Sequence, residues 1–199
     1  DHPDFQQTNT LQGFIGEGTG GVTESLKNRV IMPMTGSYWD TDHVLGHELV
    51  HAFQYNIAQS RRGGGLQGLG ALPLWLVEGM AEYMSVGRDD PLTAMWMRDA
   101  ILRDDLPTIR QLTRDARYFP YRFGQALWAY IGGTYGDDAV VQVYRRSLRV
   151  GFEGAIQQVL AMPTDTLSLR WKEAIAEEYL PFIEGRDVPA EMGQAILCP

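Results

Sequence analysis

The sequence predicts an α+β domain that is predominantly helical, with a small sheet near its N-terminus. Up to about residue 40 the chain is rich in glycine and strand-prone. From about residue 41 apolar residues recur at helical spacing between glycines and prolines. The 199 residues, 44% of them hydrophobic, can bury one substantial core. We therefore expect a single domain over residues 1–199, with a strand and loop part over about 1–40 and a helical part over about 41–199.

The strand-prone part is clearest at residues 28–34, where β-branched Val30 and Ile31 precede Pro33. Such a run predicts a short strand that the proline ends or confines to a sheet edge. Two glycine patterns, one over residues 16–21 and one over 63–68, have the spacing of dinucleotide-binding loops. Neither stands between a strand and a helix, so we expect both to be ordinary loops.

The first predicted helix covers residues 41–58. Asp40, Thr41 and Asp42 supply candidate cap and first-turn residues. Apolar residues then recur at helical spacing: Val44, Leu45, Leu49, Val50, Phe53 and Ile57. We expect this apolar face to pack into the core, and the opposite face to carry the polar residues of the helix.

Those polar residues include the run His47, Glu48, Leu49, Val50, His51. Residues four apart share one face of an α-helix, so both imidazoles can bind one metal ion. Glu48 lies about 100° round the helix, where it can take a proton from a metal-activated water as general base. This His-Glu-x-x-His pattern is typical of Zn²⁺ sites that hydrolyse peptide bonds.

A catalytic zinc site needs a third protein ligand. His43 cannot join both other histidines, because eight residues of helix separate it from His51 by roughly 12 Å. The metzincin extension is also missing, since Gln54 and Ile57 stand where it requires glycine and histidine. A carboxylate is therefore expected. Glu78 and Glu82 lie four apart in the otherwise apolar helical segment 74–83, where carboxylates are rare unless paired or bound to metal.

On these residues the chain resembles the gluzincin zinc metallopeptidases, which include the thermolysin and aminopeptidase N families, and in particular the peptidase MA-like domain. The segment 75–79, Trp-Leu-Val-Glu-Gly, is similar to the third-ligand segment of the aminopeptidases. The resemblance implies a zincin-like fold in which Glu78 binds Zn²⁺ and Glu82 holds an imidazole N–H of a ligand histidine. The segment 121–124, Tyr-Arg-Phe-Gly, is similar to the one that supplies the oxyanion donor. That similarity implies this role for Tyr121, with Tyr118 as the alternative.

The resemblance implies a zinc-dependent peptidase with one Zn²⁺ per chain and a peptide or protein substrate. It places the strand at 28–34 along a cleft between the sheet and the helical lobe. A weaker similarity, at residues 21–25, would make Glu24 a ligand for a free substrate amine. The resemblance also implies an extracytoplasmic location, secreted or in the cell envelope, and an adjoining domain outside this chain. Two alternatives stay open: a zinc-stabilised binding or scaffold domain that has lost hydrolysis, and a zinc hydrolase of a non-peptide bond.

Charge and hydropathy argue against a nucleic-acid-binding protein and against a membrane-spanning one. A net charge of −8 and a pI near 4.9 disfavour nucleic acid as a partner. We expect the arginines between residues 98 and 122 to pair with nearby aspartates. No apolar run reaches the 18 or more residues of a membrane span. The C-terminal half should form helices over about 92–103, 107–114, 122–135, 137–149, 152–160 and 165–184.

Overall fold

A computed structural model describes residues 2–8, 19–27, 29–34, 36–60 and 64–186. The prediction of a predominantly helical α+β chain with a small sheet is confirmed. The elements are α1 (His2–Thr8), β1 (Val22–Glu24), β2 (Arg29–Ile31), α2 (Tyr38–Gln59), α3 (Gly65–Gly70), α4 (Leu74–Val86), α5 (Pro91–Leu102), α6 (Ile109–Arg114), α7 (Pro120–Tyr135), α8 (Asp137–Leu160) and α9 (Thr164–Ile183). Within the described residues, none of the helices combines the length and the hydrophobicity of a transmembrane span.

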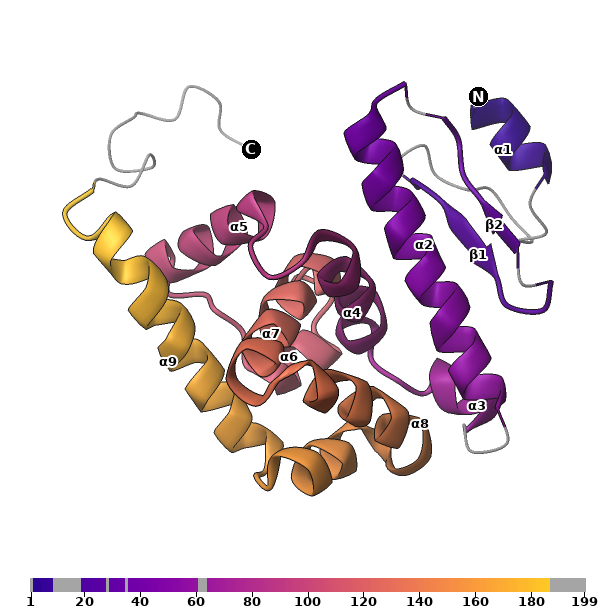
Figure 1. Ribbon diagram of the computed structural model, residues 1–199. Coiled ribbons are helices and arrows are strands. Elements are labelled where there is room, and N and C mark those ends of the chain that lie inside the picture. Colours follow the sequence, from indigo (N-terminus) through magenta and orange to yellow (C-terminus); the bar gives the residue numbers. More distant parts are fainter. Residues whose placement is uncertain (1, 9–18, 28, 35, 61–63, 187–199) are drawn as a thin grey trace.

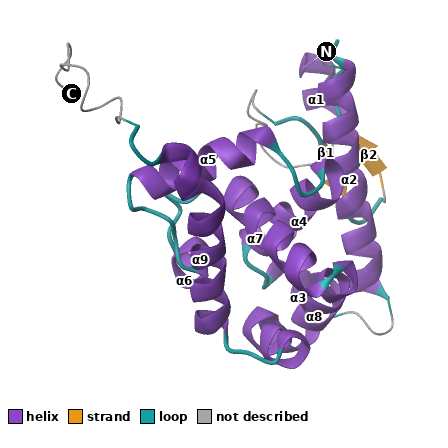
Figure 2. Ribbon diagram, turned by 60° about the vertical axis from the view of Figure 1, so that its left-hand side comes forward, coloured by secondary structure: helices purple, strands orange, loops and turns teal. Residues whose placement is uncertain are grey.

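Helix α2 separates the two parts of the fold. Figure 1 shows α1 and the sheet on one side of α2 and helices α4 to α9 on the other, and in the turned view of Figure 2 helices α4 to α9 again lie to one side of α2. Strands β1 and β2 are antiparallel, with Val22 opposite Ile31 and Glu24 opposite Arg29. The last pair is also an ion pair of 3.0 Å between the two side chains. Sequence reasoning had not anticipated the short helix α1.

Helix α2, which carries the His-Glu-x-x-His run, begins earlier than predicted, and its orientation differs from our expectation. Ser37 caps α2, because its side chain accepts a hydrogen bond from the Asp40 amide at 3.3 Å. The expectation that the apolar face would be in the core is wrong. The buried residues of α2 are His47, Glu48, His51, Gln54 and Ala58. Because α2 is covered by the sheet on one side and by α4 on the other, the polar face is the one enclosed.

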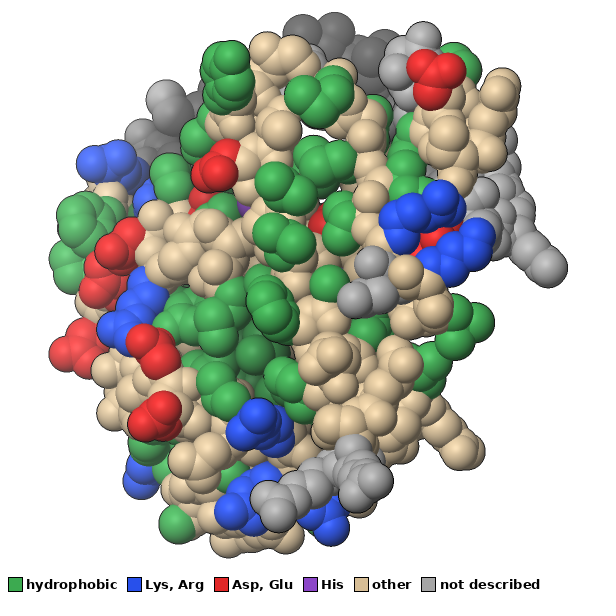
Figure 3. All heavy atoms as spheres, turned by 45° about the vertical axis from the view of Figure 1, so that its right-hand side comes forward, with side chains coloured by type: hydrophobic (Ala, Val, Ile, Leu, Met, Phe, Trp, Pro, Cys, Tyr) green, Lys and Arg blue, Asp and Glu red, His purple; other side chains and the backbone are tan. Residues whose placement is uncertain are grey.

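Much of the apolar face of α2 lies instead at the surface of the described structure, although Ile57 packs against the core. Leu45, Leu49 and Phe53 are 41%, 45% and 68% exposed. Figure 3 turns forward the side of the molecule that carries α2 and the sheet, and hydrophobic side chains are prominent on that face. Apolar periodicity therefore identified the helix correctly but assigned the wrong face to the core.

Helices α4 and α7 cross at two glycines, one from each helix. A Cβ atom added at Gly124 would lie 2.8 Å from the Cα of Gly79, and one added at Gly79 would lie 3.0 Å from the backbone nitrogen of Gln125. Both distances are shorter than ordinary van der Waals contact, so the two backbones touch only because neither residue has a side chain. Trp75 and Trp128 flank the crossing in the core, and the Trp128 indole donates to the Leu76 carbonyl at 3.1 Å.

The remaining helices follow the predicted ranges closely. Helix α8 contains both predicted segments 137–149 and 152–160, joined at Gly151, whose φ of 75° interrupts the helical geometry. The expectation of a loop over 63–68 is corrected, since residues 65–70 form α3, while Gly63 lies outside the described residues. A Cβ on Gly68 would overlap the backbone of Leu148, so α3 needs glycine where it packs against α8.

Candidate metal centre

Helices α2 and α4 bring together the three residues that the sequence selected as metal ligands. The Nε2 atoms of His47 and His51 are 3.0 Å apart, and Glu78 Oε2 lies 3.2 Å from each of them. In a tetrahedral site with bonds of about 2.0–2.1 Å to zinc, neighbouring ligand atoms lie about 3.3 Å apart. The three atoms therefore already have nearly the spacing of three ligands around one ion, and they fit a metal site.

Hydrogen bonds at the far side of each imidazole fix its orientation. His47 Nδ1 is 2.9 Å from Glu82 Oε1, and His51 Nδ1 is 2.8 Å from Gln54 Oε1. Each Nδ1–H can donate to its oxygen, which leaves the Nε2 lone pairs directed toward Glu78. Gln54 is itself held by donating to the Val77 carbonyl at 3.0 Å. Sequence reasoning missed this role of Gln54, although a polar residue three positions after His51, on the helix face that carries both histidines, was a usable signal.

Glu82 is the centre of a buried ionic network behind the ligands. Its Oε1 atom is also 3.1 Å from His43 Nε2. Its Oε2 atom lies 3.0 Å from Arg122 Nη1, at ion-pair distance but without hydrogen-bond geometry. The same guanidinium nitrogen donates to Asp90 Oδ2 at 3.0 Å. Arg122 therefore pairs with acids on α4 and at the start of α5, whereas Arg103 and Arg117 pair with nearby aspartates as expected.

The pKa values show how strongly this cluster favours positive charge. Burial opposes protonation of His47, but its hydrogen bonds to Glu78 and Glu82 outweigh burial and raise its pKa to about 9. Burial likewise disfavours the ionised carboxylates, yet hydrogen bonds from the histidines lower the pKa of Glu78 and of Glu82 to about 2. Without a metal, a proton shared among these groups supplies the positive charge that a bound cation would provide.

Glu48 is buried and lines a pocket of about 370 Å³ next to the centre. The Thr23 hydroxyl, on β1, lies 2.6 Å from Glu48 Oε2 and 2.8 Å from the Glu48 backbone carbonyl. A Cβ at Gly21 would lie 2.7 Å from Glu48 Cγ, so a side chain at residue 21 would displace this carboxylate. The sequence held no signal for Thr23, because strand pairing and the packing of β1 on α2 bring it to Glu48.

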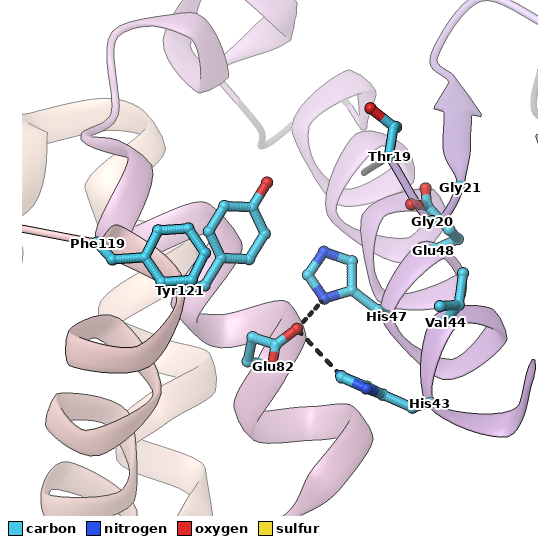
Figure 4. Close-up of a pocket in the computed structure, with 10 residues that line it drawn as sticks. All are labelled: Thr19, Gly20, Gly21, His43, Val44, His47, Glu48, Glu82, Phe119 and Tyr121. Carbon is cyan, nitrogen blue, oxygen red and sulfur yellow. Dashed lines mark hydrogen bonds and ion pairs between the residues drawn. The ribbon is translucent and has the colours of Figure 1, made fainter. Parts of the chain in front are cut away.

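The pocket has two unlike walls. Figure 4 shows Thr19, Gly20 and Gly21 on one side, near Glu48, and Phe119 with Tyr121 on the other; His43, His47 and Glu82 lie between. The segment along the cleft is therefore 19–21, before β1. This corrects the expectation that the strand at 28–34 would lie there. Glu24 does not line the pocket, and its carboxylate is engaged by Arg29.

Tyr121 lies against the centre. Its ring stacks on His47 with a centroid distance of 5.7 Å and an interplanar angle of 15°. Burial and the negative charge of Glu78 raise the pKa of Tyr121, so its phenol stays protonated and can donate a hydrogen bond. Tyr118, the alternative, is buried in the core and donates to Asp105 at 2.6 Å. It does not line the pocket.

We compared the chain with protein-family models, with curated proteins and with solved structures. None of the three comparisons finds a match.

Proposed function

We propose that this chain is a zinc-dependent peptidase of the gluzincin type, with a zincin-like fold. The observation that carries the proposal is the convergence of His47 Nε2, His51 Nε2 and Glu78 Oε2 at 3.0–3.2 Å from one another, beside the buried carboxylate of Glu48. Two imidazoles and one carboxylate are a ligand set of catalytic zinc, and they leave a fourth position for water or substrate.

A second group, His43 with His47 and Glu82, could also hold a metal. Two features favour the first group. Arg122 lies against Glu82 and would repel a dication there, whereas Glu78 has no arginine in an ion pair among the described residues. In the first group the Nδ1 atoms of both histidines keep their acceptors, so both Nε2 atoms can ligate. We assign Glu82 and His43 the role of holding His47.

The remaining residues fit peptide hydrolysis. Zinc, when bound, supplies a Lewis acid that polarises a carbonyl and makes water more acidic. Glu48 takes the proton from the attacking water and passes it to the leaving amine. Tyr121, on the opposite wall, donates a hydrogen bond from its phenol to the oxyanion. Hydrogen bonds of this kind lower the free energy of the transition state by about 3–4 kcal/mol in other enzymes. A peptide or protein is then the substrate, and we extend the proposal to an extracytoplasmic setting and to an adjoining domain outside this chain.

The test compares wild type with Glu48→Gln on a mixture of peptides, with the zinc content of each protein measured. Glutamine keeps the size of the side chain and removes the base. We expect one zinc per chain in both proteins, and cleavage by wild type alone. Cleavage by neither, with zinc bound, would reject the peptidase and leave the scaffold domain or the non-peptide hydrolase. Glu78→Ala tests the ligand set separately, because undiminished zinc in that variant would refute it.

A further inference from the structure

Four aromatic rings, each in contact with the next, lead from the surface to the metal centre. Trp96 on α5 lies against Phe119 with a centroid distance of 5.5 Å and an angle of 34°. Phe119 stacks on Tyr121 at 5.0 Å and 23°, and Tyr121 stacks on His47 at 5.7 Å and 15°. Phe119 and Trp96 are 41% and 37% exposed, and Phe119 lines the pocket beside Tyr121, as Figure 4 shows.

We propose that Phe119 and Trp96 form a subsite that binds an aromatic or large apolar side chain of the substrate, on the side of the cleaved bond that lies over Tyr121. The inference rests on the proposed peptidase function, because it takes Tyr121 to mark the position of the reacting carbonyl. It adds a specificity that neither the ligands nor the base require.

The two exposed rings of Phe119 and Trp96 form a shelf, and its construction supports this role. Phe119 is the cap residue of α7 and precedes Pro120, which fixes the backbone there. Trp96 is held from below by an edge-to-face contact with buried Phe123, at 6.0 Å and 87°. The exposed rings are therefore fixed in place, so little conformational entropy is lost when a side chain stacks on them. Single exposed apolar residues are common, but adjacent stacked rings that open into a polar cleft are typical of a binding site.

The opposite wall of the pocket can hold the main chain of a peptide whose side chain lies on Phe119 and Trp96. Gly20 and Gly21 present backbone without side chains, and Val44 adds an apolar surface near them. An extended peptide can lie along the glycine wall through its main chain while one of its side chains turns toward the shelf. Selectivity would then come from the aromatic side alone.

The experiment measures binding and cleavage with a pair of peptides that differ only by phenylalanine or alanine at one position, scanned through the sequence. Binding is measured on zinc-loaded Glu48→Gln, and kcat/KM on the active protein. At one position we expect phenylalanine to be preferred by about tenfold or more, as expected for one buried, stacked ring. Phe119→Ala should remove most of that preference, Phe119→Leu should keep a part of it, and Phe182→Ala, an exposed aromatic on α9, should leave it unchanged.

The outcomes separate the two proposals. Equal binding of both peptides at every position would overturn the subsite, even if the peptides are cleaved. An equal loss of kcat for both peptides in Phe119→Ala, with the preference intact, would also overturn it, because Phe119 would then only brace Tyr121. Selective binding that is lost in Phe119→Ala, without cleavage by the active protein, would support the aromatic subsite and reject the peptidase.

Discussion

Replacing Gly124 with alanine would test whether the crossing of α4 and α7 sets the geometry of the centre. The added Cβ would lie 2.8 Å from Gly79 Cα and 3.2 Å from the carbonyl carbon of Trp75. Carbon atoms in contact prefer about 3.5–4.0 Å, so the helices must separate by about 1 Å. The atoms in the way belong to backbone, which cannot turn aside as a flexible side chain can.

The expected decrease in the free energy of unfolding follows from that separation. Overpacking a tight core costs about 1–3 kcal/mol, and the backbone clash places this variant at the upper end, about 3 kcal/mol. For a domain of this size, that lowers the midpoint of thermal unfolding by about 6–12 °C. Gly79 follows Glu78, and Gly124 lies three residues after Tyr121. The same movement therefore shifts a ligand relative to Tyr121, and a displacement of about 1 Å can reduce kcat/KM on the order of a hundredfold.

The assay is thermal unfolding of the metal-free protein followed by circular dichroism, together with kcat/KM of the zinc-loaded protein. Gly133→Ala on the same helix is the matched control, because a Cβ there meets nothing within 4 Å. It should stabilise the protein by up to about 1 kcal/mol through helix propensity and leave activity unchanged. A Gly124→Ala protein as stable and as active as the Gly133→Ala control would refute this account of the crossing.

Three further predictions concern the groups behind the centre. Thr23→Val removes the hydroxyl that contacts Glu48 and should lower kcat about tenfold, with KM and zinc content retained. Thr23→Ser keeps the hydroxyl and should keep most of kcat. Unchanged kcat in Thr23→Val would show that this contact does not orient Glu48. Arg122→Met leaves Glu82 and Asp90 buried without their cation and should lower the free energy of unfolding by about 3–5 kcal/mol, measured by urea titration, whereas Arg122→Lys should lose less. In the metal-free protein, the stability due to His47 is present below pH 6.5 and lost as pH rises through about 9. The stability due to Glu78 and Glu82 is present above pH 4.5 and lost as pH falls toward 2. Urea titrations should accordingly give a maximal free energy of unfolding between about pH 4.5 and 6.5. Zinc affinity should rise with pH up to about 9, and proton release on zinc binding should be detectable by calorimetry in two buffers. A zinc affinity independent of pH over that range would contradict the raised pKa of His47.

The local patterns determined much of the fold. The helix that carries His47 and His51, the helix that carries Glu78 and Glu82, and the helices of the C-terminal half all follow from periodicity and from the placement of glycine and proline. Such signals lie within a few residues of one another along the chain, which is why they can be read without a structure. The faces of α2 could not be assigned this way, because periodicity shows that two faces differ and not which of them is covered.

Some residues of the centre could likewise be identified from local sequence patterns, and others could not. His47, His51 and Glu78 were identifiable as candidate ligands because the types and spacing of metal ligands are restricted. Thr23, Arg122 and the contact of Trp96 with Phe119 were not. Thr23 and Arg122 act on Glu48 and Glu82, which lie 25 and 40 residues away, and Trp96 lies on another helix; any hydroxyl, arginine or ring could have filled these places. The sequence by itself therefore identified the candidate metal ligands and the candidate base of the proposed reaction. Only the tertiary structure decided what holds those residues and what shapes the cleft, since packing between distant segments has no local signature in the chain.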